Sequence, residues 1–169
     1  MGNAPDLKVD GTGRRVAIVA ARFNEAVTDE LLSGARRALV AAGVREEDVH
    51  EFRVPGAFEI APTIRQVLAY GPEVDAIVAL GAVIRGETPH FEYISDAVSH
   101  ALQSLANEIN VPLAFGVLTA DTREQAKERA DRERLDKGGE AARGALSQIE
   151  TYEAVRESRT AGVRGFRVP

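Results

Sequence analysis

Four short segments of this sequence place polar or aromatic side chains directly after a run of apolar residues. They are residues 22–24 (RFN), 55–59 (PGAFE), 85–90 (RGETPH) and 119–121 (TAD). If the apolar runs are parallel strands, these segments meet at the carboxyl edge of one sheet, where such folds bind ligands. Together they supply aromatic rings, carboxylates, a hydroxyl and an imidazole. Such a set can stack on a flat heterocycle, hold an anion and move a proton.

The segment from Arg85 to His90 carries most of this chemistry. It leads from an apolar run into a helical pattern, so backbone N–H groups near Glu87 and Thr88 could hold an anion such as phosphate. Thr88 adds a hydroxyl and Arg85 a charge. His90 is the one histidine of three that falls at this edge, and an imidazole titrates near neutrality, which suits proton transfer. The alternative interpretation is an ordinary turn capped by Thr88, with a histidine that has no catalytic role.

Five further side chains are candidates that also have a simpler explanation. Phe23 could stack on a ligand or pack against the helix that follows it. Phe115 lies within an apolar run and could be a core residue. Glu59 falls near a helix start, where the helix dipole alone favours a carboxylate. Arg129 and Lys137 could bind a ligand or be ordinary solvated charges.

The common cofactor and metal motifs are missing from the sequence. No two histidines have the spacing of a metal-binding pair, and the chain contains no cysteine. Neither a dinucleotide-binding GxGxxG after a strand nor a P-loop is present, and there is no GxSxG nucleophile elbow. The sequence therefore predicts a site without metal and without cofactor.

Composition excludes several other classes of protein. The 169 residues include 21 basic and 26 acidic side chains, a net charge of −5, which argues against a nucleic-acid partner. The longest apolar run, residues 76–84, is too short to cross a bilayer, so no membrane association is expected. Residues 1–6 lack a basic region followed by an apolar stretch, and we expect a cytoplasmic protein.

Strand-like and helix-like patterns alternate along the chain and must position these segments. The expected strands span residues 15–21, 49–54, 75–84 and 112–118, and a helical pattern follows each of them. Thr28 or Asp29 is expected to cap the first helix, and Thr122 opens a capping box three residues before Gln125. The alternation predicts a three-layer α/β/α fold with a four-stranded parallel sheet. Residues 1–14 are predicted to form an N-terminal arm, 15–155 a single domain and 156–169 a C-terminal tail.

Taken together, the segments resemble the 6,7-dimethyl-8-ribityllumazine synthase family. The resemblance is carried by ARFNEAVTDELLSGA (21–35), VPGAFEIA (54–61), GAVIRGETPHFEYI (81–94), PLAFGVLTADTREQAKERA (112–130) and KGGEAA (137–142). These stretches occur in the order and at the spacing of the family and cover residues 16 to about 155. The combination is highly specific, although no single motif is.

The resemblance implies a flavodoxin-like fold and a cofactor-free condensation. The family joins 5-amino-6-(D-ribitylamino)uracil to 3,4-dihydroxy-2-butanone 4-phosphate, and releases phosphate and water. By resemblance, His90 matches the proton donor, and Glu87, Thr88 and Arg129 match the phosphate site. The residues that match the ribitylaminouracil site are Phe23, Ala57, Phe58, Glu59, Ala82, Val83, Ile84, Phe115 and Lys137. In the family, a neighbouring subunit supplies the residues that Phe115 and Arg129 match.

The resemblance also implies assembly. Family members form pentamers with active sites at subunit interfaces, some build hollow shells of twelve pentamers, and association with a riboflavin synthase is implied as well. Residues 6–9 of the arm are expected to pair with the sheet edge of a neighbouring subunit.

Residues 131–136 (DRERLD) depart from the glycine-rich link, similar to GTKAGN, that many shell-forming relatives carry between their last two helices. The length matches and the composition does not, which leaves the choice between pentamer and shell open. Glu87 also departs, because many relatives have a small residue there.

Two other functions remain compatible with the same resemblance. One is a shell or flavin-binding scaffold that has lost catalysis. The other is a related enzyme that dismutates two lumazines into riboflavin. Because Phe23, His90 and Arg129 are all present, the sequence favours the synthase over the scaffold.

Overall fold

Four parallel strands form the central layer of the molecule, in the order β2-β1-β3-β4. The computed structural model describes residues 8–160. The strands are β1 (Val16–Ala21), β2 (Val49–Val54), β3 (Ala76–Ile84) and β4 (Leu113–Ala120). Val16 of β1 lies opposite Val49 on one side and Ala76 on the other. The predicted four-stranded parallel sheet is confirmed.

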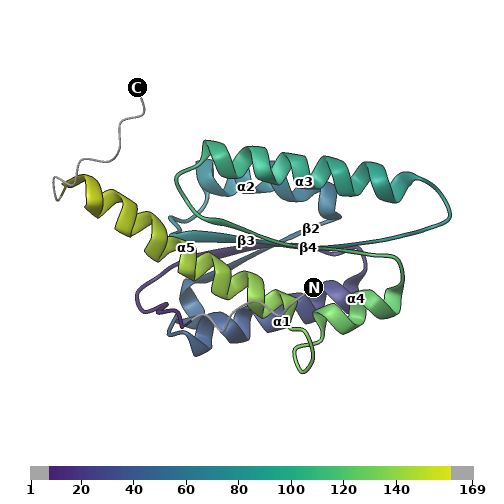
Figure 1. Cartoon of the computed structure of the whole chain (residues 1–169), viewed down its shortest axis with the longest axis horizontal. Helices are drawn as coiled ribbons and strands as arrows, with labels where there is room; N and C mark the ends of the chain where they lie inside the picture. Colours follow the sequence, from purple (N-terminus) through teal and green to yellow (C-terminus); the bar gives the residue numbers. More distant parts are fainter. Residues whose placement is uncertain (1–7, 161–169) are drawn as a thin grey trace.

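Helices cover both faces of this sheet (Figure 1). One face carries α1 (Glu25–Ala41), α4 (Arg123–Ala130) and α5 (Lys137–Thr160), and the other carries α2 (Ile60–Tyr70) and α3 (His90–Glu108). Two short 3₁₀ turns, Glu46–Asp48 and Ala57–Glu59, precede β2 and α2. The three layers are those predicted, and the strand order is flavodoxin-like, with its reversal between β1 and β3. None of the helices within residues 8–160 is long and apolar enough to cross a membrane.

The two central strands are apolar on both faces because helices bury both faces. Every residue of β1 is buried; Ile18 packs towards α1 and α5, and Val19 packs towards α2 and α3. At the edge of the sheet, β2 contains three polar residues among its six and is only half buried. The polar residues thus mark β2 as an edge strand, whereas the other edge strand, β4, is mostly apolar in sequence.

Helix α1 begins earlier than predicted. It starts at Glu25 and is preceded by Asn24, whose φ of 63° and ψ of 44° are left-handed. Thr28 is fully buried inside the helix, where its hydroxyl lies 3.4 Å from the carbonyl oxygen of Glu25, so neither Thr28 nor Asp29 is the cap. Asparagine tolerates the left-handed backbone better than most residues, which lets the chain turn directly from β1 into the helix.

The capping box before α4 is confirmed at its first half. The Thr122 hydroxyl accepts a hydrogen bond of 3.2 Å from the Gln125 backbone N–H. The Gln125 side chain reaches one residue further back than a standard box and accepts from Asp121 N–H at 3.0 Å. Strand β4 continues to Ala120, beyond the predicted end, because it stays paired with β3 as far as Ile84.

The described part of the N-terminal segment packs on its own chain. Val9 lies against the core, and the Gly11 N–H donates to the Ala42 carbonyl oxygen at 2.7 Å. Arg14 forms two parallel hydrogen bonds, 2.7 and 2.8 Å long, with the carboxylate of Glu153 on α5. Of the arm expected to pair with a neighbour, residues 6 and 7 lie outside the described residues. Helix α5 runs to Thr160, into the range expected to be a tail, and residues 161–169 also lie outside the description.

The link between α4 and α5 makes its turn without glycine. Only Asp136 in residues 131–136 has a positive φ, of 41°. Its carboxylate accepts from Gly139 N–H at 3.2 Å and from Arg143 at 3.3 Å. The bend therefore depends on one acidic residue that tolerates this backbone, held by hydrogen bonds.

Candidate active site

A pocket of about 600 Å³ opens at the carboxyl edge of the sheet, where the strand order reverses. Its walls come from the turns after β1 and β2, from the end of β3 and from the start of α3. The predicted site residues that line it are Phe23, Ala57, Phe58, Glu59, Ala82, Val83, Ile84, Thr88 and His90. Residues up to 71 positions apart in the sequence, from Phe23 to Ile94, thus share one cavity.

Two exposed aromatic rings stand at this pocket. Phe23 is 71% exposed and Phe58 is 59% exposed, whereas Ala57 beside Phe58 is buried. Exposed phenyl rings cost free energy in water and gain it when a flat ligand stacks on them. The alternative interpretation of Phe23, that it packs against the following helix, does not fit its exposure.

Glu59 is oriented by the backbone of its own turn. Its Oε2 atom accepts a hydrogen bond of 2.9 Å from Gly56 N–H, while Oε1 has no partner among the described residues. Glu59 also stands immediately before α2, where the helix dipole favours a carboxylate. One oxygen is thus fixed, and the other is left to accept from a ligand hydroxyl.

The loop before α3 presents backbone donors. Within residues 8–160, the N–H groups of Gly86, Glu87 and Thr88 have no hydrogen-bond acceptor. Gly86 and Thr88 line the pocket, but the Glu87 side chain does not. These donors sit at the N-terminus of a 19-residue helix, whose dipole adds to their attraction for an anion.

His90 is the first residue of α3 and lies on the helix instead of in the loop. Its imidazole is exposed at the pocket and has no hydrogen-bond partner among the described residues. A histidine in this position can give or take a proton beside the backbone donors of the preceding loop.

Arg85 is not available as a free charge for an anion. Its Nε donates to the Asp121 carboxylate at 2.8 Å, its Nη1 donates to Glu92, and its guanidinium stands 4.4 Å from the centre of the Phe91 ring. The hydrogen bond from Arg85 also holds the pKa of Glu92 below its ordinary value. The cation predicted to help bind an anion is therefore paired with two carboxylates.

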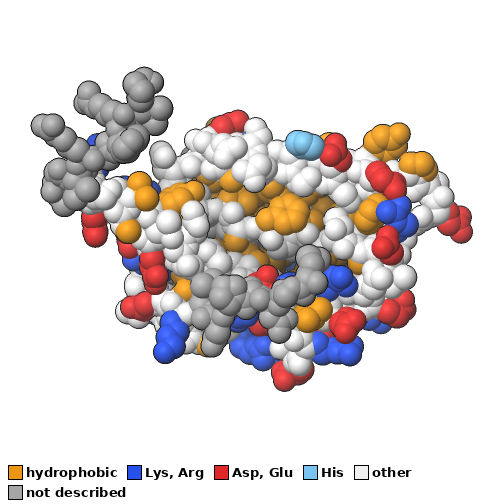
Figure 2. Space-filling view, viewed as in Figure 1, with side chains coloured by type: hydrophobic (Ala, Val, Ile, Leu, Met, Phe, Trp, Pro, Cys, Tyr) orange, Lys and Arg blue, Asp and Glu red, His pale blue; other side chains and the backbone are white. Residues whose placement is uncertain are grey.

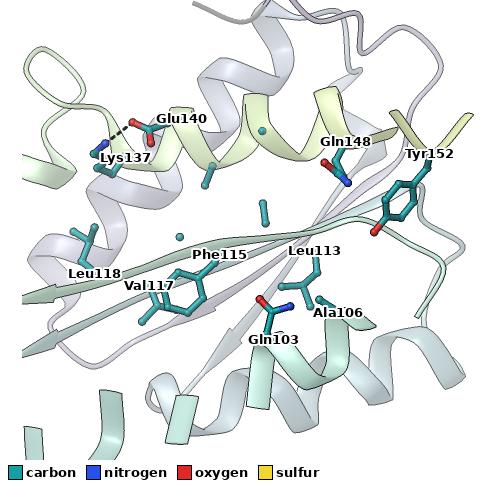
Figure 3. Close-up of a pocket in the computed structure, with 14 residues that line it drawn as sticks. Gln103, Ala106, Leu113, Phe115, Val117, Leu118, Lys137, Glu140, Gln148 and Tyr152 are labelled. Carbon is teal, nitrogen blue, oxygen red and sulfur yellow. Dashed lines mark hydrogen bonds and ion pairs between the residues drawn. The ribbon is translucent and has the colours of Figure 1, made fainter. Parts of the chain in front are cut away.

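Besides Glu87, whose neighbours Gly86 and Thr88 line this pocket, three predicted site residues lie outside it in the single chain: Phe115, Lys137 and Arg129. Phe115 and Lys137 line a second cavity of about 430 Å³ along β4, between α3 and α5 (Figure 3). Lys137 is paired there with Glu140, and Phe115 is 50% exposed, so Phe115 is not a core residue. Arg129 lies half-buried on α4 and donates to the Gln125 carbonyl oxygen at 3.3 Å. One chain does not bring these three side chains to the pocket that holds His90.

The second cavity belongs to an open edge. Among the described residues β4 pairs only with β3, so the other edge of β4 has no strand beside it. Figure 2 shows hydrophobic side chains gathered along this band between the two helical layers. Leu113, Phe115 and Val117 contribute to it from β4, and Tyr152 contributes from α5.

Sequence reasoning missed Gly56, Gly86, Phe91 and Ile94, which also line the first pocket. A usable signal existed for Ile94, because it stands four residues after His90 and so shares one face of α3 with it. No such signal existed for the glycines, which contribute only backbone to the wall.

The fold and the pocket define a flavodoxin-like α/β protein with a cavity where the strand order reverses, the place at which such folds bind ligands. Comparison with known sequences then identifies the family. A family model described as 6,7-dimethyl-8-ribityllumazine synthase matches residues 13–153. The chain belongs to this family.

Individual relatives with the name 6,7-dimethyl-8-ribityllumazine synthase agree with the family model. A protein of Kineococcus radiotolerans is 50% identical over 155 residues, covering 90% of this chain and 92% of its own. One of Anaeromyxobacter dehalogenans is 50% identical over 145 residues (86% and 89%). One of Aquifex aeolicus is 46% identical over 149 residues (88% and 96%).

Proposed function

We propose that the protein condenses 5-amino-6-(D-ribitylamino)uracil with 3,4-dihydroxy-2-butanone 4-phosphate in the first pocket. The products are 6,7-dimethyl-8-ribityllumazine, phosphate and water. One observation carries the proposal: exposed aromatic rings, unpaired backbone donors and an imidazole line a single cavity in a chain of this family. Two substrates held face to face in such a cavity avoid much of the entropic cost of a bimolecular reaction.

In this proposal the ribitylaminouracil occupies the aromatic side of the pocket. Phe23 and Phe58, both exposed, stack on or flank the pyrimidine ring. Ala57, Ala82, Val83 and Ile84 form the walls and floor around it. Glu59, with one oxygen held by Gly56 N–H, accepts a hydrogen bond from a ribityl hydroxyl through the other.

The phosphate-bearing substrate is proposed to bind at the loop before α3. The N–H groups of Glu87 and Thr88 and the Thr88 hydroxyl donate to its phosphate. The loop and its immediate contacts contain one cation, Arg85, and three carboxylates, those of Glu87, Glu92 and Asp121. A phosphate dianion here needs a further cation, and we propose that Arg129 of a neighbouring subunit supplies it.

His90 is proposed to transfer the protons of the reaction. Imine formation, phosphate elimination and ring closure each move a proton to or from carbon, nitrogen or oxygen, and an imidazole can serve all of them. The proposal requires neither a metal nor a cofactor.

The arrangement of the remaining residues supports a homo-oligomer with active sites between subunits. Phe115 and Lys137 lie at the open edge of β4, on a side of the molecule that a second copy can cover. We therefore propose that they join Arg129 in completing the pocket of a neighbour in a pentamer. The link of residues 131–136 makes its turn at Asp136 although it contains no glycine, so the lack of glycine does not prevent the turn. We therefore propose that the link is compatible with a shell of twelve pentamers, with which a riboflavin synthase can associate.

Residues 15–155 are proposed to act as one catalytic domain, with residues 1–14 as an arm at the subunit contact and 156–169 as a tail. A cytoplasmic location is part of the proposal, because phosphorylated and polyhydroxylated substrates are retained there. Cell fractionation tests the location.

The deciding experiment mixes the purified protein with both substrates and follows lumazine absorbance alongside release of phosphate. We expect equal rates of the two, proportional to protein and well above the spontaneous reaction. Binding of lumazine without turnover would instead indicate a scaffold. Formation of riboflavin from lumazine alone would indicate the dismutating enzyme. Either result would refute the proposed condensation.

A further inference from the structure

The start of helix α3 is tied to a distant part of the chain by one side chain. Arg85 is the first residue after β3, and its backbone N–H donates to the Ala120 carbonyl oxygen at 2.9 Å. Its guanidinium bonds Glu92, in the first turn of α3, and Asp121, in the turn after β4. Arg85 thus joins residues 7 and 36 positions away in the sequence.

The same guanidinium also braces a wall of the active-site pocket. It stands over the ring of Phe91 at 4.4 Å, and Phe91 lines the pocket beside His90. A cation over an aromatic ring is attracted to it, and the planar fork of arginine fits two carboxylates at once. Lysine, a point charge on a flexible stem, cannot make all three contacts in one geometry.

We propose that Arg85 is a positioning residue, which fixes the first turn of α3, and with it His90 and the anion-binding loop, against the turn after β4. This inference rests on the proposed function for the role of His90. Among the described residues, the side chains of residues 85–90 make no other hydrogen bond or ion pair with β4, α4 or the turn between them. Without Arg85, the start of the helix loses its ion pairs to the turn after β4 and keeps its packing, such as that of Ile94 against the core.

Replacing the two carboxylate partners of Arg85 distinguishes this positioning role from a direct role as a phosphate ligand, because the two roles predict opposite effects on the site. If Arg85 acts through Glu92 and Asp121, then replacing both with the amides, E92Q with D121N, damages the site as much as losing the arginine. If Arg85 binds phosphate, the same replacement frees the guanidinium and strengthens binding of the phosphate-bearing substrate. The two roles therefore differ in the sign of one effect.

The kinetic test compares R85Q, R85K and the double variant E92Q/D121N with wild type. We expect R85Q and the double variant each to lower kcat about 10- to 100-fold with KM for both substrates little changed, because misplacement by about 1 Å costs this much. R85K should recover part of the loss. A rise in KM for the phosphate-bearing substrate alone in R85Q, with a fall of that KM in the double variant, would overturn the proposal.

Arg45 provides a matched control. It also pairs with two carboxylates, Asp48 at 2.6 Å and Glu47 at 3.1 Å, but stands at the amino end of β2, away from the pocket. R45Q removes the same charge and the same number of ion pairs. We expect its kcat and KM to equal those of wild type, and an equal loss in R45Q and R85Q would also overturn the proposal.

A second measurement does not depend on activity. Hydrogen–deuterium exchange, read by mass spectrometry on peptides covering residues 86–95, reports how firmly the start of α3 is held. We expect faster exchange in R85Q and in E92Q/D121N, and wild-type exchange in R45Q. Unchanged exchange in R85Q would refute the positioning role even if the protein proved inactive. If the wild-type protein does not catalyse the condensation but R85Q still exchanges faster than wild type, the proposed function is refuted and the positioning role is not.

Discussion

At the scale of single residues, the proposed chemistry depends on an imidazole at a helix start and on the backbone that places it. His90 has no hydrogen-bond partner among the described residues, so its ring is free to meet a substrate. Asn24, next to the pocket residue Phe23, connects the turn after β1 to β3, because its side-chain amide donates to the Ala82 carbonyl oxygen at 2.9 Å. In the proposed function His90 acts on the substrate, and Asn24 holds the turn that carries Phe23 against β3.

We expect H90A to lower kcat by about 10²- to 10⁴-fold with little change in KM, because general acid–base catalysis contributes about this much. Steady-state kinetics with each substrate varied in turn measure the effect. H100A is the control, since His100 is exposed on the same helix and, within residues 8–160, is bonded only to Asp96. An equal loss of substrate affinity in H90A would contradict the role in proton transfer.

Two substitutions at Asn24 separate backbone strain from hydrogen bonding. N24G keeps the left-handed conformation and loses the bond to Ala82, so we expect a loss of about 1 kcal/mol. N24A loses the bond and also places a Cβ in the left-handed region, for a loss of about 2 kcal/mol or more. Urea unfolding at one fixed protein concentration measures both. Equal losses would show that the backbone of Asn24 is not strained.

At the scale of elements, the sequence predicted those parts that follow from local pattern. The apolar runs of β1 and β3 predict buried strands, and Thr122 predicts a helix cap. Both predictions depend only on residues that are close together in the sequence. The predicted start of α1 was wrong, because Asn24 precedes the helix in a left-handed backbone conformation and makes no side-chain hydrogen bond that caps it. The pairing of Arg85 with Asp121 could not be predicted, since it depends on β3 and β4 lying side by side.

The contact between the N-terminal segment and α5 gives a prediction about pH. Hydrogen bonding to Arg14 lowers the pKa of Glu153, so the folded state binds a proton there less readily than the unfolded chain. The resulting stabilisation is fully present above the unfolded pKa, about 4.3, and is lost as the pH falls through the lower folded pKa. We expect E153Q to unfold at a lower temperature than wild type at pH 7, and the difference to shrink below about pH 4. A difference independent of pH would assign the effect to packing.

At the scale of the whole molecule, the site residues fall into two groups that one chain does not unite. Phe23, Glu59 and His90 share the first pocket, while Phe115 and Lys137 lie along β4. The sequence resemblance predicted a division between subunits for Phe115 and Arg129. Composition and periodicity alone could not have done so, because they describe a chain and not its contacts with copies of itself.

Subunit complementation tests this division. H90A and R129A are each expected to be inactive, the first in proton transfer and the second in phosphate binding. Co-expressed in equal amounts, they should form mixed assemblies in which about a quarter of the interfaces have both residues intact, given random symmetric assembly. We expect activity to return to about that fraction of wild type. Mixed assemblies without activity would place both residues in the site of one chain.

The open edge of β4 also bears on how the protein must be made. A strand edge that has no partner among the described residues, and that carries an exposed phenyl ring, is a template on which other chains can add, whether correctly or not. A newly synthesised subunit therefore carries an aggregation hazard until a partner covers that edge. Slow or dilute synthesis prolongs the exposure, so yield of native protein should depend on how quickly subunits meet. The strand that the proposed catalytic assembly needs is then also the one that makes solitary subunits vulnerable.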